Sequence, residues 1–338
     1  MIDYLTDFAY MSLLVVVVAL TLIFDFINGF HDSANSIATV VSTKALSPLL
    51  AVFIAAIFRF LSFLVFPMNV AHTIGKGVVD PSVISLNVLG GALVAAIIWN
   101  LLTWWWGFPS SSSHTLVGGL VGAAVAGAGF KSVIISGVIK IISFIFIAPM
   151  IGLLISFTIS SLILWIIKGI RPLIIHKVFK RLQLVSSSAL SLGHGGNDAQ
   201  KSMGVIWAAM LIAGLITKDR EIPFWVIISC QTAIALGTLF GGWRIVKTMG
   251  QRITKIKPYE GFCTETASSV TLVISTFLGI PVSTTHTVTG AIVGVGARKG
   301  LSAVKWGMTR KIFWAWLLTV PVSALIGASM YYVFSFFS

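Results

Sequence analysis

Charged side chains are scarce in this sequence. Only 10% of its 338 residues are Asp, Glu, Lys or Arg, and 57% are hydrophobic, whereas soluble domains usually carry about 25% charged residues. This shortage excludes a water-soluble globular domain, and the repeated apolar stretches indicate an integral membrane protein with many spans. The stretches are long and continuously apolar rather than alternating, which favours helices over a β-barrel.

Cysteine is rare as well. Cys230 and Cys263 stand in apolar surroundings without the spacing of metal ligands, so we interpret them as small core residues and expect no metal centre and no cofactor. The net charge of +13 reflects Lys and Arg between the apolar segments. We therefore expect a lipid bilayer around the chain and no nucleic-acid partner.

Apolar segments recur along the whole chain. They run at 11–30, 48–67, 84–106, 113–130, 133–167, 186–216, 223–243, 262–280, 283–298 and 312–336. The run 133–167 is too long for one upright span, and Pro149 and Gly152 could break it. We predict an all-α polytopic membrane protein with about 10–12 transmembrane segments.

Three stretches between these segments are rich in Lys and Arg: 168–181, 244–257 and 298–311. Such loops face the cytoplasm, which places both termini outside the cytoplasm and the chain in the cell (inner) membrane. The connector 168–185 divides the chain into a first membrane repeat at 1–167 and a second at 186–338. About ten spans leave an odd number in each half, so related halves would have inverted topology.

One polar motif occurs in each half. GFHDSANSIA begins at Gly29 and returns as GGNDAQKSMG, which pairs Asp32 with Asp198. Asp25 and Asn28 precede Asp32 at spacings that align all three on one face of an unbroken helix. Carboxylates in apolar segments cost several kcal/mol unless a cation or water offsets them, which favours cation coupling. The alternative is a purely structural ion pair, for which partners are available at Arg59, Lys140 and Lys201.

The second copy of this motif lies in the glycine-rich stretch SLGHGGNDAQKSMG, from Ser191 to Gly204. We expect these glycines to break an apolar helix, and broken helices at membrane depth persist only where they line a cavity or a site. The N-termini of half-helices offer N–H groups to an anion, while unwound carbonyls and Asp oxygens suit a small hard cation.

A second motif also occurs twice. GFPSSSSHTLVG begins at Gly107 and GIPVSTTHTVTG at Gly279, which pairs His114 with His286. Each copy places a run of hydroxyls and a His-Thr pair at the predicted start of a helix. Plain N-capping explains one Ser or Thr, but a hydroxyl run with an imidazole in both copies suits a tetrahedral, multiply charged oxyanion.

Together, GFHDSAN with GGNDAQK and GFPSSSSHT with GIPVSTTHT resemble the signature repeats of the inorganic phosphate transporter (PiT) family, most closely its bacterial low-affinity branch. The resemblance spans the chain from about Asp25 to Trp316. It implies a helical inverted repeat that moves inorganic phosphate with sodium or protons, or as a metal–phosphate complex, with the signature motifs forming central phosphate and cation sites.

The chain departs from the typical family motif G-A-N-D-x-A-N at two places. His31 replaces an Asn in the first copy, and Gln200 and Lys201 replace Ala and Asn in the second. Lys201 thus aligns with Asn35, where its ammonium could substitute for a bound sodium or contact phosphate. Sodium stoichiometry therefore cannot be transferred from sodium-coupled relatives.

The motifs and the resemblance together define the candidate residues. Those expected to bind phosphate are Ser111, Ser112, Ser113, His114, Thr115, Ser283, Thr284, Thr285, His286, Thr287, Asn197, Gln200 and Lys201. Those expected to couple cations are Asp25, Asn28, Asp32, Asn35, Asp198 and Glu265.

We predict a secondary symporter of inorganic phosphate that works by alternating access, with a homodimer as an open option for its assembly. A transporter of another tetrahedral oxyanion such as sulfate, or an anion channel, is the alternative. Enzyme activity is not expected, because the sequence has no G-x-S-x-G or H-E-x-x-H motif and each half duplicates the candidate residues.

Overall fold

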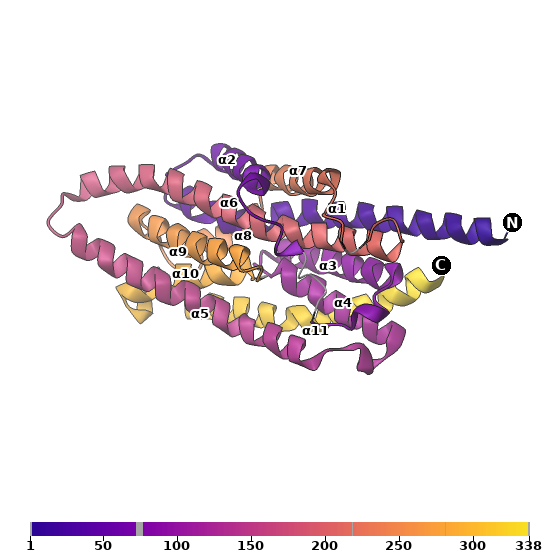
Figure 1. Cartoon of the computed structure of the whole chain (residues 1–338). Helices are drawn as coiled ribbons and strands as arrows, with labels where there is room; N and C mark the ends of the chain where they lie inside the picture. Colours follow the sequence, from indigo (N-terminus) through magenta and orange to yellow (C-terminus); the bar gives the residue numbers. More distant parts are fainter. Residues whose placement is uncertain (1, 72–76, 218, 281, 337–338) are drawn as a thin grey trace.

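The protein is a helical bundle (Figure 1), and the computed structural model describes residues 2–71, 77–217, 219–280 and 282–336. The elements in chain order are α1 (Ile2–Ser42), α2 (Pro48–Phe60), η1 (Leu61–Leu64), η3 (Pro81–Val83), α3 (Leu86–Trp106), α4 (Ser112–Ala128), η4 (Phe130–Ser132), α5 (Ile135–Ile166), α6 (Pro172–Ile212), α7 (Phe224–Phe240), α8 (Trp243–Gln251), α9 (Pro258–Phe277), α10 (Thr284–Lys299), η5 (Leu301–Ala303) and α11 (Trp306–Phe336). An isolated β-bridge joins Val79 to Val133. The predicted all-α fold is confirmed.

Helix length and apolar composition together identify candidate membrane spans. Within the described ranges, four helices are long and apolar enough to cross a membrane: Tyr10–Ser42, Leu86–Trp106, Ile135–Ile166 and Trp306–Phe336. The pair α7 and α8, bent by 70°, is a fifth candidate. With 17 and 16 residues, α4 and α10 measure about 25 Å, less than the roughly 30 Å hydrocarbon core. These spans confirm a polytopic helical membrane protein, and the count of about 10–12 segments stays a prediction.

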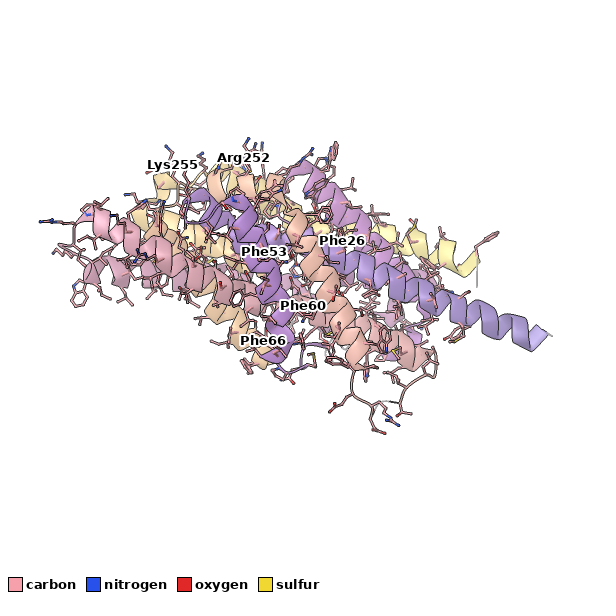
Figure 2. The ribbon with its side chains drawn as sticks, turned by 90° about the horizontal axis from the view of Figure 1, so that it is seen from above. Phe26, Phe53, Phe60, Phe66, Arg252 and Lys255 are labelled. Atoms are coloured by element: carbon pink, nitrogen blue, oxygen red, sulfur yellow. The ribbon has the colours of Figure 1, made fainter. Side chains whose placement is uncertain are left out.

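The outer surface of the bundle is apolar. On α5, Ile135 and Leu154 are 70% and 57% exposed, and on α11 Leu325 is 71% exposed. On α2, Phe53 is 56% exposed and lies on the outside of the bundle (Figure 2). Exposed apolar surface of this extent is typical of a face covered by lipid, so the chain is a multi-pass membrane protein.

The expected helix break at GHGGND is wrong. Both copies of the first motif lie inside unbroken helices of 41 residues, α1 and α6. Likewise, α5 continues through Pro149 and Gly152 as one helix of 32 residues, so the run 133–167 is not divided there.

Close packing, not bending, explains the glycines of α6. A Cβ on Gly195 would lie 2.5 Å from the Arg59 carbonyl oxygen, and one on Gly196 would lie 2.3 Å from the ring of Phe66. Both distances are shorter than any real contact, so a side chain at either position would push away the α2–η1 segment or the Phe66 ring that follows it. The glycines let this segment approach α6 closely while the helix continues.

The two longest helices, α1 and α6, run in opposite directions along the bundle (Figure 1). Both termini lie at one end, while the connector between α5 and α6 lies at the other. Arg252 and Lys255 also lie away from the free end of α1 (Figure 2). The basic stretches therefore gather at the end opposite the termini, as expected if that end faces the cytoplasm.

The short helices α4 and α10 are held by matching glycines. A Cβ on Gly118 of α4 would lie 2.6 Å from the carbonyl oxygen of Val320 in α11. A Cβ on Gly290 of α10 would lie 2.1 Å from the carbonyl oxygen of Pro149 in α5. Each short helix thus packs its backbone directly on a long helix of the other half of the chain, which fixes where the second motif sits.

Candidate functional site

The second motif forms two equivalent helix starts. After α3, Gly107 adopts φ 72° and the chain reverses into α4; after α9, Gly279 adopts φ 66° before α10. The Ser111 hydroxyl accepts a hydrogen bond from His114 N at 3.3 Å, and that of Ser283 accepts one from His286 N at 3.2 Å. The predicted helix starts are confirmed, and Ser111 and Ser283 are their N-caps. Pro281 lies outside the described residues.

Hydroxyls from both helix starts converge on Asp32 of α1. Ser112 Oγ donates to Asp32 Oδ2 at 3.2 Å, and Thr285 Oγ1 donates to Asp32 Oδ1 at 3.3 Å. Asn35, one turn further along α1, donates to Thr285 Oγ1 at 2.9 Å and to Thr284 Oγ1 at 3.5 Å. The first motif of one half therefore contacts the second motif of both halves, although Asp32 and Thr285 are far apart in the chain.

The hydroxyls of Thr115 and Thr287 do not contact Asp32. They donate to the backbone carbonyls of Ser112, at 2.7 Å, and Ser283, at 3.0 Å. Such bonds to the preceding turn use the hydroxyl within its own helix. These two threonines belong to the same helix starts but do not contact the acids.

The two motif histidines stack rather than hydrogen-bond. Their ring centroids lie 4.9 Å apart, and His286 stacks on Trp316 with centroids 4.0 Å apart. His114 lines a cavity of about 370 Å³, whereas His286 is not among the residues that line it. Of the pair, His114 is the one that faces this cavity.

The second signature acid, Asp198, forms an ion pair with Lys201. Lys201 Nζ lies 2.5 Å from Asp198 Oδ1 and also donates to Ser113 Oγ at 2.5 Å. Both Asp198 and Lys201 are buried, and removing one partner from such a pair leaves a costly unpaired charge. A contact at 3.5 Å to the Val282 carbonyl places the ammonium between the two helix starts.

His194 connects the two signature acids. Its Nε2 lies 2.6 Å from Asp198 Oδ2 and 4.0 Å from Asp32 Oδ2. On the other side of the ring, Arg59 Nη2 lies 2.8 Å from Nδ1. Because a guanidinium can only donate, Nδ1 accepts, and the proton of a neutral His194 is on Nε2, between the acids. One ligand atom from each of Asp32, His194 and Asp198 lies within 4.8 Å of the others.

Arg59 is fully buried and reaches α1 and α7 as well. It donates to the carbonyl oxygens of Asp32, at 2.6 Å, and Gly29, at 3.3 Å, and to Thr238 Oγ1 at 3.0 Å. A buried guanidinium needs nearly all its hydrogen bonds, and these come from groups around the acids. With Lys201, it supplies two positive charges beside two carboxylates.

Asp25 and Glu265 lie in separate polar clusters. Asp25 accepts from Ser202 Oγ at 2.5 Å, which joins α1 to α6. Glu265 accepts from Thr39 Oγ1 at 2.5 Å, from Gln183 Nε2 at 2.9 Å, and from Ser186. Neither carboxylate forms an ion pair within the described residues. The structural ion pair considered for the acids thus applies to Asp198 and not to these two.

Asn28, Asn197 and Gln200 differ in their surroundings. The buried amide of Asn28 has no hydrogen-bond partner in the described part of the chain. Asn197 donates weakly to Thr276 Oγ1 at 3.3 Å. Gln200 accepts from Val70 N at 2.9 Å and donates to the Pro67 carbonyl at 2.9 Å, so its amide holds the loop after η1 and does not meet the hydroxyl runs.

Sequence reasoning placed neither Arg59 nor His194 in the site. The sequence offers a signal for each: Arg59 is the only charged residue in the apolar run 48–67, and His194 directly precedes the second copy of the first motif. His31 was noted only as a departure. Its Nδ1 lies 2.9 Å from Asp32 Oδ1 and its Nε2 lies 3.1 Å from Thr103 Oγ1. An ionisable group within an apolar helix is by default a candidate for a functional site.

Two segments of the chain, residues 28–175 and 171–327, match the model of the phosphate transporter family. The chain belongs to this family. It is 52% identical to the "Probable low-affinity inorganic phosphate transporter" of Rhizobium meliloti (strain 1021), over 95% of this chain and 96% of that protein. Identity is 43% to the protein of the same name in Bacillus subtilis (strain 168), over 96% and 97% of the two chains.

A solved structure is similar as well. "The sodium-dependent phosphate transporter" is 29% identical and superposes with a TM-score of 0.86, over 96% of this chain and 99% of that one. The predicted resemblance to the bacterial low-affinity branch is therefore confirmed. As a member of this family, the chain is a transporter and not an enzyme.

Proposed function

We propose that this family member is a secondary symporter that moves inorganic phosphate together with a cation. The observation that carries the proposal is the meeting of Asp32 and Asp198, one from each half, through His194 at 4.0 and 2.6 Å. Hydroxyls from both helix starts reach the same place. Oxyanion donors beside paired acids favour cotransport of an anion with a cation over an anion pore.

Alternating access would follow from two inverted halves. The opposite directions of α1 and α6, and the crossed packing of α4 on α11 and α10 on α5, support this arrangement. Rocking of one half against the other around a fixed central site would expose phosphate to each side in turn. The gathering of basic stretches at one end supports an inner-membrane protein whose termini lie outside the cytoplasm.

Lys201 and Arg59 bear on the coupling cation. Lys201 neutralises Asp198, while Arg59 donates to the backbone carbonyl of Asp32 and not to its carboxylate, so a sodium ion at Asp198 would have to displace or compete with a fixed ammonium. This arrangement supports proton coupling, with Lys201 taking the place of one metal cation. His194 lies between both acids, and chains of Asp and His side chains form proton relays in membrane pumps and transporters.

Transport of a metal–phosphate complex is the second candidate. One ligand atom from each of Asp32, His194 and Asp198 lies within 4.8 Å of the others, and carboxylate and imidazole are common ligands of divalent metals. The nearby ammonium and guanidinium oppose a dication there, which is why symport of free phosphate is the leading proposal.

Counterflow of labelled phosphate in proteoliposomes tests these proposals directly. Sodium, pH and magnesium are varied separately, with sulfate as a competing anion. We expect saturable phosphate exchange and accumulation driven by a proton gradient without sodium. Accumulation only with sodium would overturn proton coupling, an absolute need for magnesium would favour the metal–phosphate complex, and non-saturable flux would indicate a channel.

A further inference from the structure

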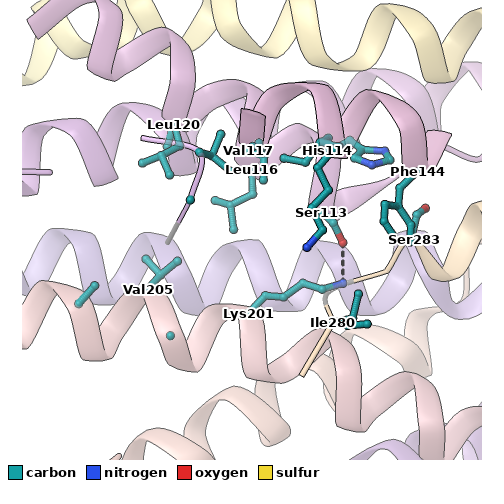
Figure 3. A pocket seen from close by; sticks show the side chains of 18 of the residues that line it. Ser113, His114, Leu116, Val117, Leu120, Phe144, Lys201, Val205, Ile280 and Ser283 are labelled. Atoms are coloured by element: carbon teal, nitrogen blue, oxygen red, sulfur yellow. Dashed lines mark hydrogen bonds between the residues drawn. The ribbon is translucent and has the colours of Figure 1, made fainter. Parts of the chain in front are cut away.

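A cavity of about 370 Å³ leads to the site from the end of the bundle that bears the termini. Its deep part reaches Lys201, Ser113 and Ser283, which Figure 3 shows together with His114. Its other part reaches Gly77 and the beginnings of α3 and α5. Apolar side chains such as Leu116, Val117, Leu120 and Val205 form much of the wall (Figure 3).

Two lysines and no carboxylate line this cavity among the described residues. They are Lys201 and Lys140, and the other polar side chains are Ser113, His114 and Ser283. Lys201 is paired with Asp198 at 2.5 Å, so its charge is neutralised locally. Lys140 forms no ion pair within the described ranges. The net positive charge of the cavity therefore comes from Lys140.

Lys140 is exposed on α5, and no ion pair among the described residues accounts for its charge. Lys140 is the only charged residue between Lys131 and Lys168, in an otherwise apolar stretch. It lies in the second turn of α5, near the helix end that disfavours a cation. Asp80, the N-cap of η3, accepts hydrogen bonds from Ser82 N at 2.9 Å and Ser82 Oγ at 2.7 Å and forms no ion pair with Lys140.

We propose that Lys140 and this cavity form a vestibular anion site that captures inorganic phosphate before it reaches Lys201. The inference rests on the proposed transport of phosphate by the central site. An uncompensated charge in a cleft with low-dielectric walls concentrates anions and raises their rate of association. Phosphate then passes from Lys140 to the hydroxyls and the ammonium at the deep end of the cavity.

Charge removal with a matched control tests this site. Lys140→Gln should raise the half-saturating phosphate concentration several-fold, leave the maximal rate nearly unchanged, and weaken the dependence of uptake on ionic strength. Lys140→Arg should keep wild-type values. Lys131 is exposed at the same end of the bundle and does not line the cavity. Lys131→Gln should therefore leave the half-saturating phosphate concentration and the maximal rate at their wild-type values. Equal behaviour of Lys140→Gln and Lys131→Gln would overturn the proposal.

Thiol chemistry gives an independent readout, because both native cysteines are 0% exposed. In Lys140→Cys, a cationic methanethiosulfonate should restore apparent affinity and an anionic one should lower it further. Phosphate near its half-saturating concentration should slow modification, whereas chloride at equal ionic strength should not. Modification that phosphate does not slow would contradict the site.

Wild-type uptake, measured in parallel, distinguishes failure of the vestibular site from failure of the proposed phosphate transport. If the wild type does not exchange phosphate, the proposed function fails. If the wild type transports and the Lys140 variants match it, only the vestibular site fails. Monodisperse elution of each purified variant confirms that a change in uptake does not come from misfolding.

Discussion

Lys201 Nζ lies 2.5 Å from Asp198 Oδ1, one turn earlier on α6, and 2.5 Å from Ser113 Oγ at the start of α4. A single ammonium therefore joins the signature acid of the second half to the hydroxyl run of the first. In the first half the aligned position is Asn35, whose neutral amide contacts the hydroxyls of α10. At the aligned positions, the charged Lys201 and the neutral Asn35 thus each contact the hydroxyl run of the other half.

We predict that Lys201→Asn increases the dependence of phosphate uptake on external sodium, because sodium can then neutralise Asp198. Breaking a buried ion pair costs roughly 3–5 kcal/mol, so the unfolding temperature should fall and sodium should partly restore it. Initial uptake rates against phosphate at several sodium concentrations, with thermal unfolding of the same samples, provide the measurement.

Lys177→Asn is the control for this variant, because Lys177 lies exposed on the same helix. A higher half-saturating phosphate concentration without sodium dependence would show that the ammonium binds phosphate directly. If neither quantity changes, Lys201 has no part in the site.

Asp32→Asn and Asp198→Asn should each abolish gradient-driven phosphate accumulation, because a neutral amide cannot offset a coupling cation. Accumulation in proteoliposomes under an imposed proton or sodium gradient measures this. The exposed Asp80, changed to Asn, serves as a control that should accumulate phosphate normally. Wild-type accumulation in both signature variants would refute their assignment.

Paired alanines in the hydroxyl runs should weaken phosphate binding. Ser112→Ala with Ser113→Ala, or Thr284→Ala with Thr285→Ala, removes hydrogen bonds to charged groups worth about 1.5–3 kcal/mol each. Apparent affinity should then fall tenfold or more. Thr287→Val should have a much smaller effect, because the Thr287 hydroxyl bonds to the Ser283 carbonyl. Unchanged affinity in both double variants would make the runs simple helix caps.

Arg59 should control the tautomer of His194. Replacing it with Gln offers Nδ1 an acceptor as well as a donor, so we predict that part of the His194 population moves its proton to Nδ1. Nitrogen-15 solid-state NMR of labelled histidine measures the tautomer, and proton-driven uptake should fall in proportion. Arg59→Lys keeps a pure donor and should keep the Nε2-protonated form. An unchanged histidine spectrum in Arg59→Gln would contradict this role.

The glycines of α6 allow a test of packing against flexibility. Gly195→Ala should strongly destabilise the protein, because the new Cβ would lie 2.5 Å from the Arg59 carbonyl oxygen. Gly193→Ala should be tolerated or slightly stabilising, since the nearest atom to its Cβ is 3.4 Å away. Thermal unfolding of the two variants in detergent compares them. Equal stability would mean that α2 does not depend on the close approach at Gly195.

Several features were determined by the sequence alone. The apolar runs predicted a helical membrane protein, and the duplicated motifs predicted the helix starts at Ser112 and Thr284. Both depend on local properties: hydropathy over one segment, and hydroxyl caps next to a turn. Motif alignment also paired Asp32 with Asp198, and the structure brings one ligand atom of each within 4.8 Å of the other.

Only the tertiary structure decided what the glycines and the buried cations do. The sequence GHGGND by itself predicts a flexible break in the helix. In the structure α2 packs on Gly195, the Phe66 ring packs on Gly196, and α6 continues through both. The role of Arg59 depends on α1, α6 and α7 surrounding it, and Lys201 and Lys140 differ because only Lys201 has a carboxylate within reach. These contacts join residues far apart in the chain, and residue type alone cannot encode which partner a buried charge will find.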